Sequence, residues 1–257
     1  MRAETDGTVS TAAPAGPARD VAALPLRFVP EALIALIAVA MLVHGPIAQT
    51  ARYHDFADAS VWLGIGHAAD VLSNLPFAIV GAWALWRRRA GAAWTAFDAA
   101  LVLTAIGSAY YHASPDDARL VWDRLPVAIA CAALLAAVHS EMRGRAEMPM
   151  LVGLSAAAVA SVVWWRVTGD LRPYLLLQGA PLLLVPFWQW QGGAPRRARA
   201  LFGIAIAGYV AAKACEVFDH EILAAATVVS GHTLKHLLAA AAALMIVEGR
   251  GVERRVR

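Results

Sequence analysis

Charge is scarce in this chain. Lys, Arg, Asp and Glu make up 16% of its 257 residues, whereas hydrophobic residues make up 60% and the mean hydropathy is +0.56. Soluble domains are about a quarter charged and about half apolar. The shortage of charge therefore argues against an ordinary soluble domain and favours a membrane protein.

Cysteine is also scarce. Cys131 and Cys215 each lie inside an apolar run, which favours two buried small apolar residues over a disulfide framework or a thiolate metal site. The net charge of +3 could suggest a nucleic-acid partner. We expect none, because the basic residues fall in short clusters between apolar runs and no surface interleaves them with aromatic residues.

Long apolar runs take the place of charge. A membrane-spanning helix needs about 20 apolar residues, whereas β-barrel spans alternate apolar and polar residues over about 10 positions. Eight segments fit the helical pattern, at about 30–50, 68–86, 95–113, 120–141, 148–166, 171–190, 200–218 and 222–247. They predict an all-α, polytopic transmembrane helical bundle, with a lipid bilayer as its solvent.

Arginines cluster after the second, fourth, sixth and eighth segments and are sparse in the loops between them. By the positive-inside rule, this pattern predicts an integral membrane protein with both termini in the cytoplasm. We divide the chain into a disordered polar tail at 1–28, an extra N-terminal transmembrane helix at 29–51, a seven-span core at 52–249 and a basic cytoplasmic tail at 250–257.

Ionisable residues inside membrane spans are costly and are functional candidates by default. Asp98 and His139 lie near span ends, where we expect them to reach the headgroups. Lys213 and Glu216 are three residues apart on one helix and could neutralise each other.

The stretch GHTLKH, at 231–236, lies within the last apolar run. Its two histidines, His232 and His236, are four residues apart and share a helical face, which is a frequent way to present two imidazoles to one metal. Two hydrogen-bonded interior histidines would also explain the pattern. We expect Gly231 to leave room beside a metal, and Lys235 to meet Glu216 or an acid of an outer loop.

A second polar group lies at 107–126. Ser108 and His112 are four residues apart, and Asp123 opens the next segment after a short turn, so an antiparallel helical hairpin brings them together. Three imidazoles with a fourth position left for water form a catalytic zinc geometry, and a carboxylate can take the proton of that water. Taken alone, His112 could be an interfacial histidine and Asp123 an acid at a helix start.

Oxygen-bearing side chains gather in a third stretch. Asp55 and Asp58 lie in a predicted outer loop, followed by Asp70 and Asn74. Such oxygens could bind Ca²⁺, although Asn74 could instead cap or bridge helices, as could Ser73.

The order SNL, SxxxH, an Asp eleven residues after that His, and GHxxxH in the last span resembles the alkaline ceramidase family, within the CREST superfamily of membrane hydrolases. The resemblance implies a zinc ion held by His112, His232 and His236. It also implies that Asp123 and Ser108 complete the catalytic site.

The resemblance covers about 53–248 and leaves the first span as an addition to a seven-span core. His67 stands where eukaryotic members offer a Glu to calcium, which weakens a calcium site at Asp55 and Asp58. The stretches HDFAD, VLSNLPF and VSGHTLKH resemble bacterial ceramidase-like proteins, so we expect the bacterial inner membrane.

The expected activity is hydrolysis of the amide bond of ceramide or a related membrane lipid, giving a long-chain amine and a fatty acid. One alternative is a member resembling the adiponectin-receptor or hemolysin III group, with another substrate. The other is a transporter that uses His and Asp as a proton relay.

One geometric difficulty accompanies the zinc prediction. His112 lies near the outer end of its segment, whereas His232 would lie about 15 Å below the start of a helix beginning at residue 222. The three imidazoles can meet only if the last helix starts elsewhere or tilts, or if the third span is longer.

Overall fold

The computed structural model describes residues 27–87 and 91–253. Most of the predicted tail at 1–28 and the end of the basic tail, 254–257, lie outside these residues. The helices are α2 (Val29–His44), α3 (Ala68–Leu72), α4 (Leu75–Trp86), α5 (Ala92–Ala113), α6 (Asp117–Arg143), α7 (Glu147–Thr168), α8 (Arg172–Gln191), α9 (Arg196–Val217), α10 (Asp219–Ala226) and α11 (Gly231–Glu253). Strands β1 (Val61–Trp62) and β2 (Ile65–Gly66) form a short antiparallel hairpin.

The all-α prediction is confirmed, and the chain is a multi-pass membrane protein. Within the described residues, five helices are long and apolar enough to cross a membrane, with α3 and α4 counted as one, and six if the bent pair α10 and α11 is one span. Helix α2, at 16 residues, is shorter than predicted for the segment at 30–50, because it ends at His44 before Gly45.

Local signals set the helix ends. Asp116 caps α6 by accepting a hydrogen bond from the backbone N–H of Arg119 at 2.7 Å. Gly144 and Gly169 end α6 and α7 in the left-handed conformation, with φ of 61° and 75°, which costs glycine little.

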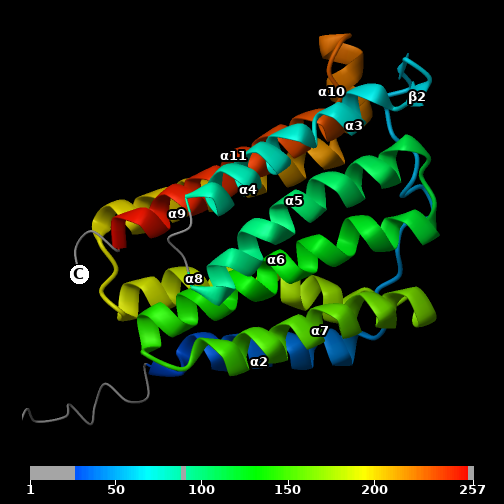
Figure 1. The fold of residues 1–257 in the computed structure, drawn as a ribbon. Coiled ribbons are helices and arrows are strands. Elements are labelled where there is room, and N and C mark those ends of the chain that lie inside the picture. Colours follow the sequence, from blue (N-terminus) through cyan, green and yellow to red (C-terminus); the bar gives the residue numbers. More distant parts are fainter. Residues whose placement is uncertain (1–26, 88–90, 254–257) are drawn as a thin grey trace, which may run out of the picture.

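Helix α6 lies at the centre of the bundle, beside α5, α7 and α8, and α9 packs along α11 (Figure 1). Its middle is a fully buried run of small residues, Ala132, Ala133, Ala136 and Ala137. Small side chains let membrane helices approach closely, which is where much of their packing energy arises.

The α5–α6 hairpin depends on Gly107. A Cβ atom at this position would lie 1.9 Å from the carbonyl oxygen of Trp122. The two helices are therefore in backbone contact at the level where α5 carries Ser108 and α6 carries Asp123.

The bundle has two chemically different ends (Figure 1). At one end, α4, α6 and α11 finish and α9 begins, so the described arginines of the predicted clusters lie together there, including Arg87, Arg143, Arg196 and Arg250. At the other end lie the loop 45–67, which includes the β1–β2 hairpin, and the helices α3 and α10. We call this second end the loop-rich end.

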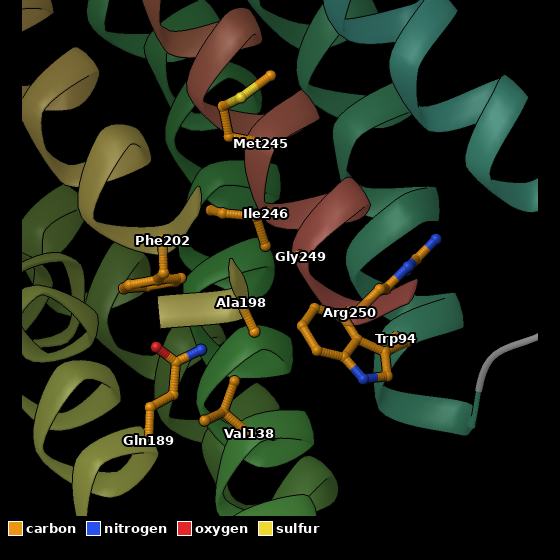
Figure 2. Close-up of a pocket in the computed structure, with 9 residues that line it drawn as sticks. All are labelled: Trp94, Val138, Gln189, Ala198, Phe202, Met245, Ile246, Gly249 and Arg250. Atoms are coloured by element: carbon orange, nitrogen blue, oxygen red, sulfur yellow. The ribbon is translucent and has the colours of Figure 1, made fainter. Parts of the chain in front are cut away.

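Asp98 corrects one prediction. Its side chain is buried and forms a two-pronged ion pair with Arg250, at 2.8 and 2.9 Å, so it is neutralised inside the protein and does not reach the headgroups. Figure 2 shows Arg250 lying beside Trp94, whose ring centre is 5.3 Å from the guanidinium carbon. The Asp98–Arg250 ion pair connects the end of α11 to α5.

The last span is also corrected. The predicted continuous segment at 222–247 is two helices, α10 and α11, which meet at an angle of 104°. Thr227 ends α10 with a φ of 65°, and the Ser230 hydroxyl accepts the N–H of Thr233 at 2.9 Å at the start of α11. Thr227 and Ser230 therefore break the helix within a stretch that the apolar pattern alone predicts to be continuous.

Candidate metal centre

Three buried histidines converge at the loop-rich end. His112 comes from the last turn of α5, and His232 and His236 come from the first two turns of α11. One ligand nitrogen from each lies within 4.8 Å of the others. Among the described residues, this is the one group of three or more His, Cys, Asp or Glu side chains placed to share a metal ion.

The bend before α11 resolves the depth difficulty. Because α11 begins at Gly231, His232 lies at the start of the helix and level with the end of α5. The histidines meet because the last helix starts later than predicted.

Gly231 has a different role from the one predicted. A Cβ atom there would lie 2.1 Å from the carbonyl oxygen of Cys215 and 2.7 Å from the Cα atom of Asp219. The missing side chain thus makes room for the backbone of α9 and α10, and not for a metal.

The ring of His236 is held in a defined orientation. Its Nδ1 lies 2.7 Å from the Ser73 hydroxyl, which donates to the carbonyl oxygen of Asp70 at 2.8 Å. Since the hydroxyl proton is used on that carbonyl, the hydroxyl accepts from His236, and the proton of the imidazole is on Nδ1. The lone pair of His236 is then on Nε2, free for a metal.

His232 is positioned through the backbone. Asp219 accepts the N–H of His232 at 2.7 Å with one carboxylate oxygen and the N–H of Ala57 at 2.9 Å with the other. The ring of Phe56 lies 4.6 Å, centre to centre, from the rings of both His112 and His232. The loop 45–67 therefore covers the triad with an aromatic side chain.

The donor set fits zinc. The Nε2 atoms of His112 and His232 are 3.2 Å apart. Two nitrogens bound to one tetrahedral Zn²⁺ at about 2.0–2.1 Å would be separated by about 3.4 Å. A hydrogen bond of Ser73 to the second nitrogen of His236 is also the outer-shell support that zinc-ligating histidines have.

Ser108 and Asp123 lie beside the triad, as the hairpin prediction required. Both line one cavity together with His236. The backbone contact at Gly107, the residue before Ser108, brings α5 to within van der Waals distance of α6 at Trp122 and Asp123. The structure therefore brings together all five residues of the predicted catalytic site.

Lys235 meets Glu216, which is one of the partners considered for it. Its Nζ donates to Glu216 at 2.5 Å and lies 3.3 Å from Nε2 of His232. Glu216 also pairs with Lys213, as predicted from their spacing. The three charges form a chain from α9 to the rim of the triad.

The cavity has a volume of about 300 Å³. Its polar end holds Ser108, Asp123 and the charged chain, whereas its walls are mainly apolar. Aliphatic and aromatic side chains of α5, α6, α8, α9 and α11 form these walls, including Leu101, Leu134, Leu182 and Phe202. This shape suits an amphiphile with one polar end.

The four residues predicted as calcium ligands fall into two pairs with different surroundings. Asp55 is exposed and pairs with Arg52, whereas Asp58 accepts the N–H groups of Ser60, Ala69 and Asp70. The second pair is more deeply placed: one oxygen of Asp70 accepts the hydroxyls of Ser230 and Thr233, and the amide of Asn74 donates to the Asp70 carbonyl. Asp70 Oδ2 and Asn74 Oδ1 are buried without a hydrogen-bond partner, so calcium binding by this deeper pair stays a prediction.

Sequence reasoning missed Asp219, Phe56 and the orienting role of Ser73. Asp219 and Phe56 lie in segments read as plain outer loops, and only their tertiary contacts give them a role. The tripeptide SNL did signal Ser73, although capping was the expected explanation.

No protein-family model matches this chain, and no curated protein matches it. The geometry of the site must therefore carry the argument for function.

Proposed function

We propose that this chain is a membrane-embedded, zinc-dependent amidohydrolase resembling the alkaline ceramidases. Its substrate would be ceramide or a related lipid amide, cleaved by one water molecule to a long-chain amine and a fatty acid. The observation that carries the proposal is a triad of buried imidazoles, one of which, His236, lines a largely apolar cavity together with Ser108 and Asp123.

In this proposal His112, His232 and His236 hold Zn²⁺, with Ser73 orienting His236. When bound, the ion would supply Lewis-acid chemistry that makes water reactive at neutral pH. The acyl chain would lie along the apolar walls of the cavity.

Asp123 and Ser108 carry the proton and charge transfers. Asp123 accepts a proton from the water molecule as the water oxygen attacks the carbonyl carbon of the amide. Asp123 then returns that proton to the amide nitrogen as the C–N bond breaks. Ser108 donates a hydrogen bond to the carbonyl oxygen as negative charge develops on it. Both side chains line the cavity beside the triad.

The proposed topology puts both termini in the cytoplasm of a bacterial inner membrane and the loop-rich end outside. The gathering of Arg87, Arg143, Arg196 and Arg250 at the opposite end supports it, because cytoplasmic loops are rich in Arg and Lys.

Elemental analysis and lipid mass spectrometry on the purified protein test the proposal together. We expect about one zinc per chain, its loss in His232→Ala, and its retention in His139→Ala, which alters a histidine packed on Trp188 away from the site. Asp123→Asn should retain zinc but release fatty acid at least 100-fold more slowly.

Less than half a zinc per chain would refute the metal site. Zinc without fatty-acid release from any lipid amide would favour an adiponectin-receptor-like or hemolysin III-like activity on another substrate. Proton flux abolished by His232→Ala, in a protein without zinc, would favour a transporter.

A further inference from the structure

Arg124 is a buried guanidinium that the proposed chemistry does not use. It follows Asp123 in α6, its exposed fraction is only 2%, and it lines the same cavity as Asp123 and Ser108. A fully buried charge is costly unless it is paired, so its partners determine what it can do.

Only some of the N–H groups of the Arg124 guanidinium have a hydrogen-bond acceptor within the protein. Its Nη2 donates to the side chain of Gln49 at 2.8 Å, whereas Nε and Nη1 are buried without any hydrogen-bond partner. None of the ion pairs formed within 27–87 and 91–253 includes it. Unpartnered N–H groups of a buried guanidinium are rare, because each loses its hydration without compensation.

Three aromatic rings surround the guanidinium of Arg124. The guanidinium carbon lies 3.9 Å from the ring centre of Trp165, 5.0 Å from that of Tyr53 and 5.4 Å from that of Tyr174. Cation–π contacts use the flat faces of the group, and its N–H donors point outward in the plane. The rings stabilise the charge but supply no oxygen acceptor, so Nε and Nη1 stay without a hydrogen-bond partner.

The charges of the cavity point to the sign of that ligand. Three cations and two carboxylates line it: Arg124, Lys213 and Lys235, with Asp123 and Glu216. Glu216 binds both lysines, and neither Arg124 nor Asp123 belongs to an ion pair among the described residues. With both carboxylates ionised, three cations against two carboxylates leave the cavity lining a net charge of +1, which favours an anionic ligand.

We propose that the substrate is an anionic lipid amide and that Arg124 binds its acidic headgroup. A carboxylate or phosphate would accept hydrogen bonds from the unpartnered nitrogens, the amide would lie at Ser108 and Asp123, and the acyl chain would follow the apolar walls. Arg124 is then a specificity-determining residue. The inference rests on the proposed amidohydrolase function and narrows its substrate class.

Paired lipids of matched chain length test the inference with the full-length, zinc-loaded protein in neutral detergent. N-palmitoyl glycine is compared with uncharged N-palmitoylethanolamine, and ceramide 1-phosphate with ceramide. We expect the wild type to bind at least one anionic lipid at least tenfold more tightly than its neutral partner. The arm with the larger ratio identifies the carboxylate or the phosphate as the headgroup.

Arg124→Gln should reduce that ratio below twofold by weakening the binding of the anionic lipid, and Arg124→Lys should retain part of the ratio. Arg119→Gln is the matched control, because Arg119 lies on the same helix and pairs with Asp116 outside the cavity. Its ratio should equal that of the wild type.

Equal binding of charged and neutral lipids by the wild type would overturn the inference, and this result needs no variant to fold. A folded Arg124→Gln protein that keeps the tenfold ratio would also overturn it. Failure of the proposed function looks different: anionic lipids would bind selectively, but no fatty acid would be released. Conversely, equal kcat/KM values for charged and neutral amides would support the hydrolase proposal and refute the headgroup site.

Discussion

The hydroxyl of Ser73 lies 2.7 Å from Nδ1 of His236, although 163 residues separate them in the chain. Because this hydroxyl donates its own proton to the Asp70 carbonyl oxygen, it can only accept from the imidazole. Ser73, in the two-residue connection between α3 and α4, thus sets the tautomer of His236 on α11.

Replacing Ser73 by alanine should weaken zinc binding about 10- to 100-fold, because His236 loses the partner that fixes its ring and tautomer. Competition with a chelator of known affinity measures the change. Ser161→Ala is the control: its hydroxyl is also buried and donates to a backbone carbonyl, of Ala158, away from the triad. Equal affinity in both variants would contradict the role of Ser73.

Gly107→Ala should destabilise the protein by at least about 2–3 kcal/mol, because the new methyl group overlaps the Trp122 carbonyl and must force α5 and α6 apart. Thermal unfolding in detergent checks this. Gly153→Ala provides the comparison, since Gly153 is also helical but has open space around it, and alanine there should be neutral or stabilising by up to about 1 kcal/mol. Similar melting temperatures for the two variants would refute the close approach.

Asp58 should make stability depend on acid pH. Burial works to raise the pKa of Asp58, but hydrogen bonds from Ser60, Asp70 and Ala69 outweigh it and leave the pKa below its ordinary value. The ionised form is therefore stabilised by folding. Its contribution is fully present above the unfolded pKa of about 3.9 and is lost as pH falls through the lower folded pKa.

Asp58→Asn should thus lower stability by about 1 kcal/mol at pH 7, as expected for a lost helix-capping charge. The difference from the wild type should shrink below about pH 4 and vanish once Asp58 is protonated in the folded protein. Melting temperatures recorded from pH 7 to pH 3 test this. A difference that stayed constant over the range would be inconsistent with the inferred pKa.

Glu216 should be more important for stability than either lysine that it binds. Glu216→Gln removes the carboxylate that both Lys213 and Lys235 bind, whereas Lys235→Met leaves Glu216 paired with Lys213. We expect the first variant to lose about 3 kcal/mol or more and the second clearly less. The double variant, measured by the same thermal unfolding, should recover part of the loss. Equal effects of the two single changes would exclude a shared counter-charge.

Much of the site could be predicted from local spacing. Ser108 and His112, like His232 and His236, share a face because they are four residues apart, and a short hairpin must return Asp123 to the same level. These relations need only helical geometry and a connection of a few residues.

Other features depend on contacts that no local pattern encodes. The break before Gly231 lies in a stretch of continuous apolarity, where Thr227 adopts a left-handed conformation and Ser230 starts a new helix. The setting of Arg124 combines Tyr53 of the loop 45–67 with Trp165 of α7 and Tyr174 of α8. In the sequence, Arg124 was no more than a neighbour of Asp123.

The bend between α10 and α11 determines how deep the histidines of α11 can lie in a membrane. Helix α11 alone, with 23 residues, is about 34 Å long, enough for a hydrocarbon layer of about 30 Å. Helix α10, with 8 residues, is too short to cross and lies at an angle of 104° to it. His232 and His236 therefore lie within about 8 Å of the start of α11, near one polar boundary of the layer that a helix of this length can cross.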